Sequence, residues 1–189
     1  MRIAFKEWAV VADALGRGDQ IIILRKGGIS EGGGGFQIEH RRFFLFPTLF
    51  HQQRDSVLPT AQARYDLIAP ELSADSLRVE YFAEVADWKF LDSLEAAERL
   101  RGQHIWRDEV IRERFDWGKS RSIYALAVRM FRLPSPVELP MRAEYGGCKS
   151  WVEFDRDLAT EGAQPALGDR EFEKRLEQFR TALQAASVT

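Results

Sequence analysis

The chain has 189 residues, of which 45% are apolar and 12% aromatic, and its formal net charge is −2. This length and composition are sufficient to bury a hydrophobic core, which excludes a fully disordered chain and favours a single domain over residues 1–189. The near-neutral charge excludes strong, indiscriminate attraction of the whole surface to nucleic acid. Lys6, Glu7 and Asp13 interrupt the apolar pattern of a signal peptide, and no run approaches the roughly 20 apolar residues of a membrane span.

Cysteine usage indicates the cellular compartment, and the distribution of charge along the chain indicates where a positive surface could form. The lone Cys148 can form neither an intrachain disulfide nor a cysteine-based zinc site by itself, so we expect a cytoplasmic protein without a cofactor. Basic and acidic side chains number 8 and 6 in residues 1–60, and 9 and 6 in residues 104–150. The other two blocks, residues 61–103 and 151–189, are acidic. Folding could bring the two basic blocks together into a local positive face, although ordinary solvated surface explains such modest excesses equally well.

Apolar periodicity predicts mixed secondary structure in the first half of the chain. The spacing of Trp8, Val11, Ala12 and Leu15 favours an amphipathic helix that stops at Gly16. The elements expected up to residue 68 are, in chain order, a helix at 3–15, a strand at 20–26, a loop at 27–35, strands at 36–40 and 42–48, and weak helical segments at 49–57 and 60–68.

The second half combines long strands with helices. A strand with one wet face is expected at 77–90, where apolar and polar residues alternate. Asp92 is the expected cap of the next helix, with Glu95 at the capping-box position. The elements expected after residue 90 are a helix at 92–102, a helix at 106–115, a strand at 122–133, a proline turn at 134–140, a strand at 148–154 and an amphipathic helix at 169–186 with its stripe on Phe172, Leu176, Phe179 and Leu183.

These elements predict an α+β fold, because strands and helices do not alternate regularly. We expect a compact mixed or mainly antiparallel sheet flanked by helices, with a core at residues 3–155 and a C-terminal helical appendage at 166–189. The strand-rich layout resembles small PUA-like barrels that bind nucleic acid, in general appearance only.

Five stretches, in the same order, resemble a known family. They are "KEWAVVADAL", "ILRKGGISE", "EHRRFFLFPTLFHQ", "IYALAVRMFRL" and "YGGCKSWVEF", and they are similar to the bacterial domain-of-unknown-function family 1802 over most of residues 4–155. The family has no established activity. Some relatives are associated with Mrr-type restriction endonuclease domains, so the resemblance implies a possible role in restriction. No room remains for such a domain after residue 155, so any cleavage would come from a separate nuclease.

The glycine-rich loop at 27–35 follows two cations, Arg25 and Lys26. Consecutive glycines let several backbone N–H groups approach one anion, so this stretch could hold a phosphate. It lacks the P-loop spacing and the dinucleotide-binding spacing, however, and a flexible hairpin tip explains the glycines equally well.

Three other groups are weaker candidates for catalysis. Glu39, His40 and His51 could act as acid, base or metal ligands, although ordinary hydrogen-bonded histidines fit the same pattern. Asp75, Asp87 and Lys89 loosely imitate a metal-dependent nuclease motif, but both acids flank one continuous strand. No histidine is adjacent to Cys148 in sequence, which favours a small buried residue over a nucleophile.

Aromatic and cationic residues together suggest the leading hypothesis, a nucleic-acid-binding or DNA-recognition module. Aromatic rings stack on bases and cations contact phosphates, although aromatics also build small cores. The predicted binding residues are Arg25, Lys26, Arg41, Arg42, Trp106, Arg112, Arg114, Trp117, Lys149 and Trp151. DNA and a separate restriction-type nuclease are the expected partners. The alternatives are an enzyme acting on a nucleotide or other phosphorylated substrate and a scaffolding subunit that docks through its C-terminal helix.

Overall fold

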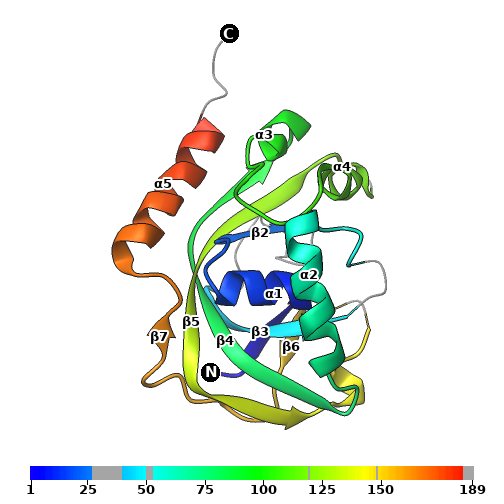
Figure 1. Cartoon of the computed structure of the whole chain (residues 1–189), viewed down its shortest axis with the longest axis vertical. Helices are drawn as coiled ribbons and strands as arrows, with labels where there is room; N and C mark the ends of the chain where they lie inside the picture. The colour runs from blue at the N-terminus through cyan, green and yellow to red at the C-terminus, as the bar shows by residue number, and fades with distance from the viewer. Residues whose placement is uncertain (27–39, 50–52, 119, 148, 185–189) are drawn as a thin grey trace.

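The structure is a computed structural model that describes residues 1–26, 40–49, 53–118, 120–147 and 149–184. The predicted loop at 27–35, most of the predicted strand at 36–40, and Cys148 lie outside these ranges. In the described part of the chain, strands and helices build an α+β fold around one curled sheet, as predicted (Figure 1).

The sheet is mixed, with the order β2-β5-β4-β3-β1-β6, and β7 pairs with β5. Only the β1–β3 pair is parallel within the described residues, and the other pairs are antiparallel. The strands are β1 (Ile3–Trp8), β2 (Ile22–Arg25), β3 (Arg42–Thr48), β4 (Ser76–Leu91), β5 (Ile123–Pro140), β6 (Trp151–Glu153) and β7 (Gln164–Pro165).

The predicted helix at 3–15 is wrong in its first half, where the chain forms β1. The three-and-four spacing belongs to α1 (Ala9–Gly16), which starts directly after Trp8. Upstream of it, Phe5 and Glu7 are buried whereas Lys6 and Trp8 are only half-buried, which fits the two-residue period of a strand. Because β1 pairs with β3 on one side and β6 on the other, its backbone groups are satisfied by the sheet. Tertiary pairing therefore decides the conformation of this segment.

The β4–β5 pair is the longest feature of the fold and forms a curved ribbon across the molecule (Figure 1). The predicted turn at 134–140 is wrong, because β5 continues through it to Pro140. Val79 pairs with Val137 whereas Tyr81 pairs with Arg132, so extra residues of β5 bulge out between these two pairs. Pro134 and Pro136 lie in the bulge, where a missing N–H leaves no ladder bond unmade.

The helices flank this ribbon. They are α2 (Pro59–Ile68), α3 (Leu94–Glu98), α4 (Asp108–Asp116) and α5 (Asp169–Gln184), with short 3₁₀ turns η1 (Ala69–Glu71) and η2 (Ala143–Tyr145). In Figure 1, α5 lies on the left of β4 and β5, whereas α1 and α2 lie on the right. No helix in the described ranges is long and apolar enough to cross a membrane.

Three helix predictions need correction in their bounds. The segment 53–57 is a turn that ends in a bridge from Val57 to Trp106, and not a helix. The helix predicted at 92–102 is shorter, and Ser93 caps it by accepting a hydrogen bond from the Ala96 N–H, so Asp92 is not the cap. Trp106 belongs to the bridge and precedes α4.

The predicted C-terminal helix is confirmed as α5, and its apolar stripe is used within the chain. Phe172, Leu176 and Phe179 are buried and belong to the larger hydrophobic cluster, together with residues of α1 and β2. This packing leaves the scaffolding hypothesis without the apolar docking face that it requires.

The close approach of α1 to β4 generates a stability prediction. A Cβ atom added at Gly16 would lie 2.5 Å from the Tyr81 ring, whereas one added at Gly168 would meet no atom within 4 Å. We expect Gly16→Ala to lower the free energy of unfolding by about 1–3 kcal/mol through overpacking. Gly168→Ala should cost less than Gly16→Ala, because its added Cβ meets no atom and it changes only the N-cap residue of α5. Urea denaturation measures both, and equal stability of the two variants would contradict this packing.

Candidate nucleic-acid interface

The two edge strands of the sheet meet at one point. Arg25, at the end of β2, donates a hydrogen bond from Nη2 to the Ser150 Oγ just before β6, at 2.9 Å. The Arg25 guanidinium also lies over the ring of Phe5 on β1, 4.7 Å from its centroid. The curled sheet is therefore closed by side chains at this point.

Aromatic rings from three elements surround this contact. Trp151, the first residue of β6, packs against Phe5 with ring centroids 4.7 Å apart and against Phe43 at 5.1 Å. The His40 ring approaches Trp151 edge-on at 5.0 Å. We call the group of Glu7, Arg25, His40, Ser150 and Trp151 the closure site.

Glu7 lies at the base of the closure site, on the same face of β1 as Phe5. Its side chain is fully buried, and its Oε2 lies 3.8 Å from Arg25 Nη1, which is too long for a hydrogen bond. Oε1 accepts a hydrogen bond from the Trp8 backbone N–H at 2.8 Å. Oε2 has no hydrogen-bond partner among the residues that the structure describes.

From the sequence, Glu7 stands out only as an interruption of an apolar segment. A period-two interpretation of residues 3–8 places Glu7 on the buried face of a strand with Phe5, and that alternation was the signal that could have identified it. Ser150 carries no comparable signal, because its role depends on the distant strand β2.

Arg114 is a second cation beside Glu7. Its guanidinium is enclosed between the rings of Trp8 and Trp106, 4.5 Å and 5.0 Å from their centroids, although the residue as a whole keeps some exposure. It donates a hydrogen bond to the Leu24 carbonyl at 2.9 Å. Burial lowers the pKa of the Arg114 guanidinium to about 10, with Glu7 opposing this shift and Arg25 adding to it. Arg114 thus holds the strand that carries Arg25.

Several predicted binding residues serve the fold and not a free surface. Lys26 donates hydrogen bonds to the carbonyls of Phe115, Ser120 and Ser122, and burial lowers the pKa of its ammonium group. Trp106 is 1% exposed, so its indole belongs to the core and is not available to a base.

The arginines on β3 and α4 are paired with acids of their own neighbourhood. Arg42 forms an ion pair with Glu84 at 2.9 Å and lies over Phe82, on the face of β3 opposite Phe43. Arg112 pairs with Glu98 at 3.2 Å. The positive charges of both arginines are therefore compensated by neighbouring acids, and Arg42 faces away from Phe43.

Three other predicted residues are exposed. Arg41 and Lys149 flank His40 and Ser150 in sequence, and both are exposed. Trp117 is 73% exposed, and it precedes Gly118, where an added Cβ would lie 3.8 Å from Lys26 Cε. Arg41 and Lys149 therefore adjoin the closure site in sequence, and the segment of Trp117 approaches Lys26, which follows Arg25.

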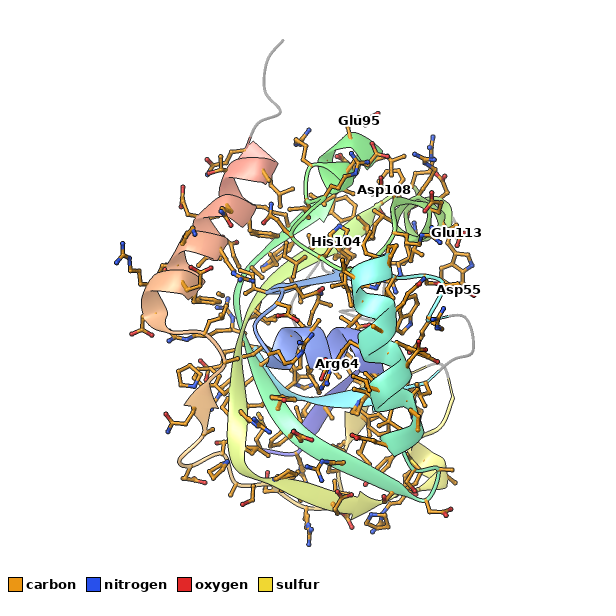
Figure 2. All side chains as sticks on the ribbon, viewed as in Figure 1. Asp55, Arg64, Glu95, His104, Asp108 and Glu113 are labelled. Carbon is orange, nitrogen blue, oxygen red and sulfur yellow. The ribbon has the colours of Figure 1, made fainter. Side chains whose placement is uncertain are left out.

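The catalytic candidates do not assemble in the described residues. Glu39 and His51 lie outside the described ranges, and His40 packs on Trp151. Asp75 and Asp87 flank and occupy one strand, and Asp87 pairs with Arg180 at 2.7 Å. Among described residues, no three His, Cys, Asp or Glu side chains form a group that could hold a metal ion. In Figure 2, Glu95, Asp108 and Glu113 are spread over the upper surface.

A separate cavity of about 650 Å³ lies between α1, α2 and the strands β3, β4 and β5. Asp13 on α1 accepts two hydrogen bonds from Arg64 on α2, at 2.7 and 2.8 Å, and Figure 2 shows Arg64 between these helices. Arg78 and Arg132, which also line this cavity, both form ion pairs with Glu80. These arginines already have acidic partners, so their positive charge is compensated within the cavity wall.

A family model described as "Domain of unknown function (DUF1802)" matches residues 4–178. The chain belongs to this family. The match extends beyond the stretches that suggested it from sequence and includes most of α5. No curated protein shows significant similarity to the chain.

Among solved structures, the DUF1802 chain is similar to an ASCH protein from Zymomonas mobilis. The TM-score is 0.46 at 14% identity, and the alignment covers 93% of this chain and 92% of that one. A point mutant of the same ASCH protein gives a TM-score of 0.44 at 15% identity, with coverages of 93% and 96%.

We expect His104 to make stability depend on pH. It is buried against Trp106, its Nδ1 has no hydrogen-bond partner in the described ranges, and burial lowers its pKa from 6.5 to about 4. As the pH falls below 6.5, the unfolded chain binds a proton that the folded chain does not, so stability falls until about pH 4. Above this window His104 contributes no pH dependence.

We expect His104→Leu to remove this slope. Between pH 7 and pH 4 the unaltered chain should lose on the order of 3 kcal/mol more unfolding free energy than the variant. Urea denaturation at a series of pH values measures the difference. Parallel pH profiles for the two proteins would show that His104 is protonated without cost in the folded state.

Arg114 should be far more important for stability than Arg112. Arg114→Met leaves the Leu24 carbonyl without its donor and Glu7 with one cation fewer, so we expect a loss of about 2–4 kcal/mol in unfolding free energy. Arg112→Met removes only an exposed ion pair and should cost less than about 0.5 kcal/mol. Equal losses in chemical denaturation would contradict the buried position of the Arg114 guanidinium.

Proposed function

We propose that this chain binds nucleic acid, and specifically recognises unpaired bases of DNA, at the closure site. The observation that supports this function best is the position of Arg25 beside Trp151, in contact through Ser150 and Phe5. A guanidinium beside an indole can hold a base by stacking while neighbouring cations contact the backbone.

The exposed residues around the closure site supply what single-strand binding requires. Trp117 keeps 73% of its surface in solvent, although a tryptophan is usually covered in a folded domain. Its indole offers a stacking platform, which contributes about 1–3 kcal/mol per base in single-strand binders. Arg41 and Lys149 are exposed cations on the segments that carry His40 and Trp151. In this proposal, one bound strand stacks on Trp117 and contacts Arg41 and Lys149 through its phosphates.

In this proposal, binding depends more on the side chains at the closure site than on the total charge of the chain. The whole chain carries a net charge of −2, so long-range attraction to a polyanion is weak. Binding would depend on short-range contacts with a few nucleotides, and double-stranded DNA would need to expose a base first. Unstacking a base costs a few kcal/mol, which favours single strands, mismatches and damaged sites.

A restriction-type role extends this proposal. Asp75 and Asp87 lie far apart along one strand and do not form a cleaving centre, so a separate nuclease in the cytoplasm would cut the DNA that this chain recognises. We expect the purified chain to bind plasmid DNA containing single-stranded regions without nicking it in Mg²⁺. Nicking that copurifies with the chain and disappears in the Arg25→Ala variant would contradict this division of roles.

Binding to labelled single- and double-stranded DNA and RNA of equal length tests the proposal. Fluorescence anisotropy at two salt concentrations should show preference for single strands, and Trp117→Ala should weaken binding about tenfold through lost stacking. The double variant Arg41→Ala/Lys149→Ala should reduce the salt slope by about 0.7 per lost phosphate contact.

Arg112→Ala is the matched control, because Arg112 is an exposed arginine whose charge is paired with Glu98 and which has no contact with the closure-site residues among those described. It should leave both affinity and salt slope unchanged. Absence of binding to every oligonucleotide would reject the proposed function. Tighter binding of RNA than of DNA would instead reassign the substrate.

A further inference from the structure

The Glu7 carboxylate is not needed for simple phosphate binding. Its side chain is fully buried, one oxygen bonds the Trp8 N–H, and the other faces Arg25 Nη1 at 3.8 Å. Burying a carboxylate oxygen without a hydrogen bond is costly, because the desolvated charge loses its water partners. A bound ligand that donates a hydrogen bond to Oε2 would therefore remove this cost.

Glu7 also argues against a phosphate as the group bound next to Arg25. A buried carboxylate repels a phosphate at short range, and the low local dielectric strengthens that repulsion. A neutral group that offers both acceptors and a donor fits better. Arg25 can supply donors, because a guanidinium has five N–H groups and one bond from Nη2 goes to Ser150 Oγ.

We propose that Glu7 and Arg25 together read the edge of one nucleobase and select guanine or cytosine over adenine and thymine. Arg25 presents two adjacent donors and Glu7 Oε2 presents an acceptor beside them. The complementary base edge carries two adjacent acceptors followed by a donor. This inference rests on the proposed function, and it adds the class of base that the closure site takes.

Base chemistry separates the four bases into two classes by this pattern. Guanine carries N7, O6 and N1–H in that order, and cytosine carries O2, N3 and the N4 amino group. Both are runs of acceptor, acceptor and donor. Adenine alternates N7, the N6 amino group and N1, and thymine alternates O2, N3–H and O4, so neither offers two neighbouring acceptors beside a donor.

The surroundings suit a flat ring. Phe5 lies under the Arg25 guanidinium, and Trp151 packs on Phe5 and Phe43. Trp151 Nε1 is buried and has no hydrogen-bond partner in the described ranges, so it offers one more donor to a bound base. The Arg25 side chain keeps 21% of its surface exposed, whereas the neighbouring Glu7 side chain is fully buried. A base would reach Glu7 when the Arg25 side chain turns away from Ser150, a rotation within one side chain.

Short oligonucleotides with a single base test this inference. Each has nine nucleotides, all abasic except the central one, which carries guanine, cytosine, adenine or thymine. We expect guanine or cytosine to bind at least tenfold tighter than adenine and thymine, as a good bidentate contact discriminates among bases. If guanine is the base read, replacing it by 7-deazaguanine, which lacks the N7 acceptor, should weaken binding. If cytosine is the base read, this replacement should leave the preference for cytosine unchanged.

Glu7→Gln provides the test within the protein. Its amide keeps the shape of the side chain but can present either a donor or an acceptor, so the preference among the four bases should fall below about threefold. Glu153→Gln is the matched control, because Glu153 is an exposed acid on β6 that pairs with Arg2. It should keep the full preference.

The outcomes separate the two proposals. If none of the single-base oligonucleotides and no ordinary single strand binds, the proposed function fails. If ordinary single strands bind but the four single-base oligonucleotides bind equally, only base reading by Glu7 and Arg25 is rejected. A Glu7→Gln variant that keeps the full preference would also reject it. Should that variant fail to fold, the base series on the unaltered chain decides alone.

Discussion

The meeting of the two sheet edges at Arg25 and Ser150 is the contact on which the site depends. Strands β2 and β6 are the two ends of the sheet order, and four other strands separate them. Sheet twist and the long, bulged β4–β5 ribbon bring these ends together. Without this curvature, Arg25 would be an edge cation and Trp151 an edge aromatic. With it, both pack on one ring, Phe5, and Arg25 lies beside one buried acid, Glu7.

Most of the cations that the sequence suggested for nucleic-acid binding have structural partners. Lys26 donates hydrogen bonds to three carbonyls in and after the last turn of α4, Arg114 lies between two indoles, and Arg42 and Arg112 pair with acids. Nearly balanced composition has this consequence generally, because acids are available to satisfy each arginine that needs one. A count of basic residues therefore overstates the positive surface, and the partners of each side chain decide what remains.

Local patterns were sufficient for much of the fold. The strands at β2, β3 and β4 and the helices at α2 and α5 follow their apolar periodicity and propensity closely. Residues 3–8 and 134–140 did not, since β1 depends on pairing with two strands and β5 tolerates its prolines only through a bulge. The same limit applies to the site: Arg25 and Trp151 were predicted separately, but their proximity and the role of Glu7 follow from long-range closure. Glu39, His51 and Cys148 lie outside the described residues.

The link between Lys26 and the end of α4 also makes the chain its own optical probe. Of the five tryptophans, Trp117 alone is exposed and the other four are buried or half-buried, all within the described ranges. Its indole therefore emits at the longest wavelength and is the first to meet a dissolved quencher. Because Lys26 ties the backbone around it to the strand of Arg25, emission from this one residue reports on the neighbourhood of the closure site without any attached label.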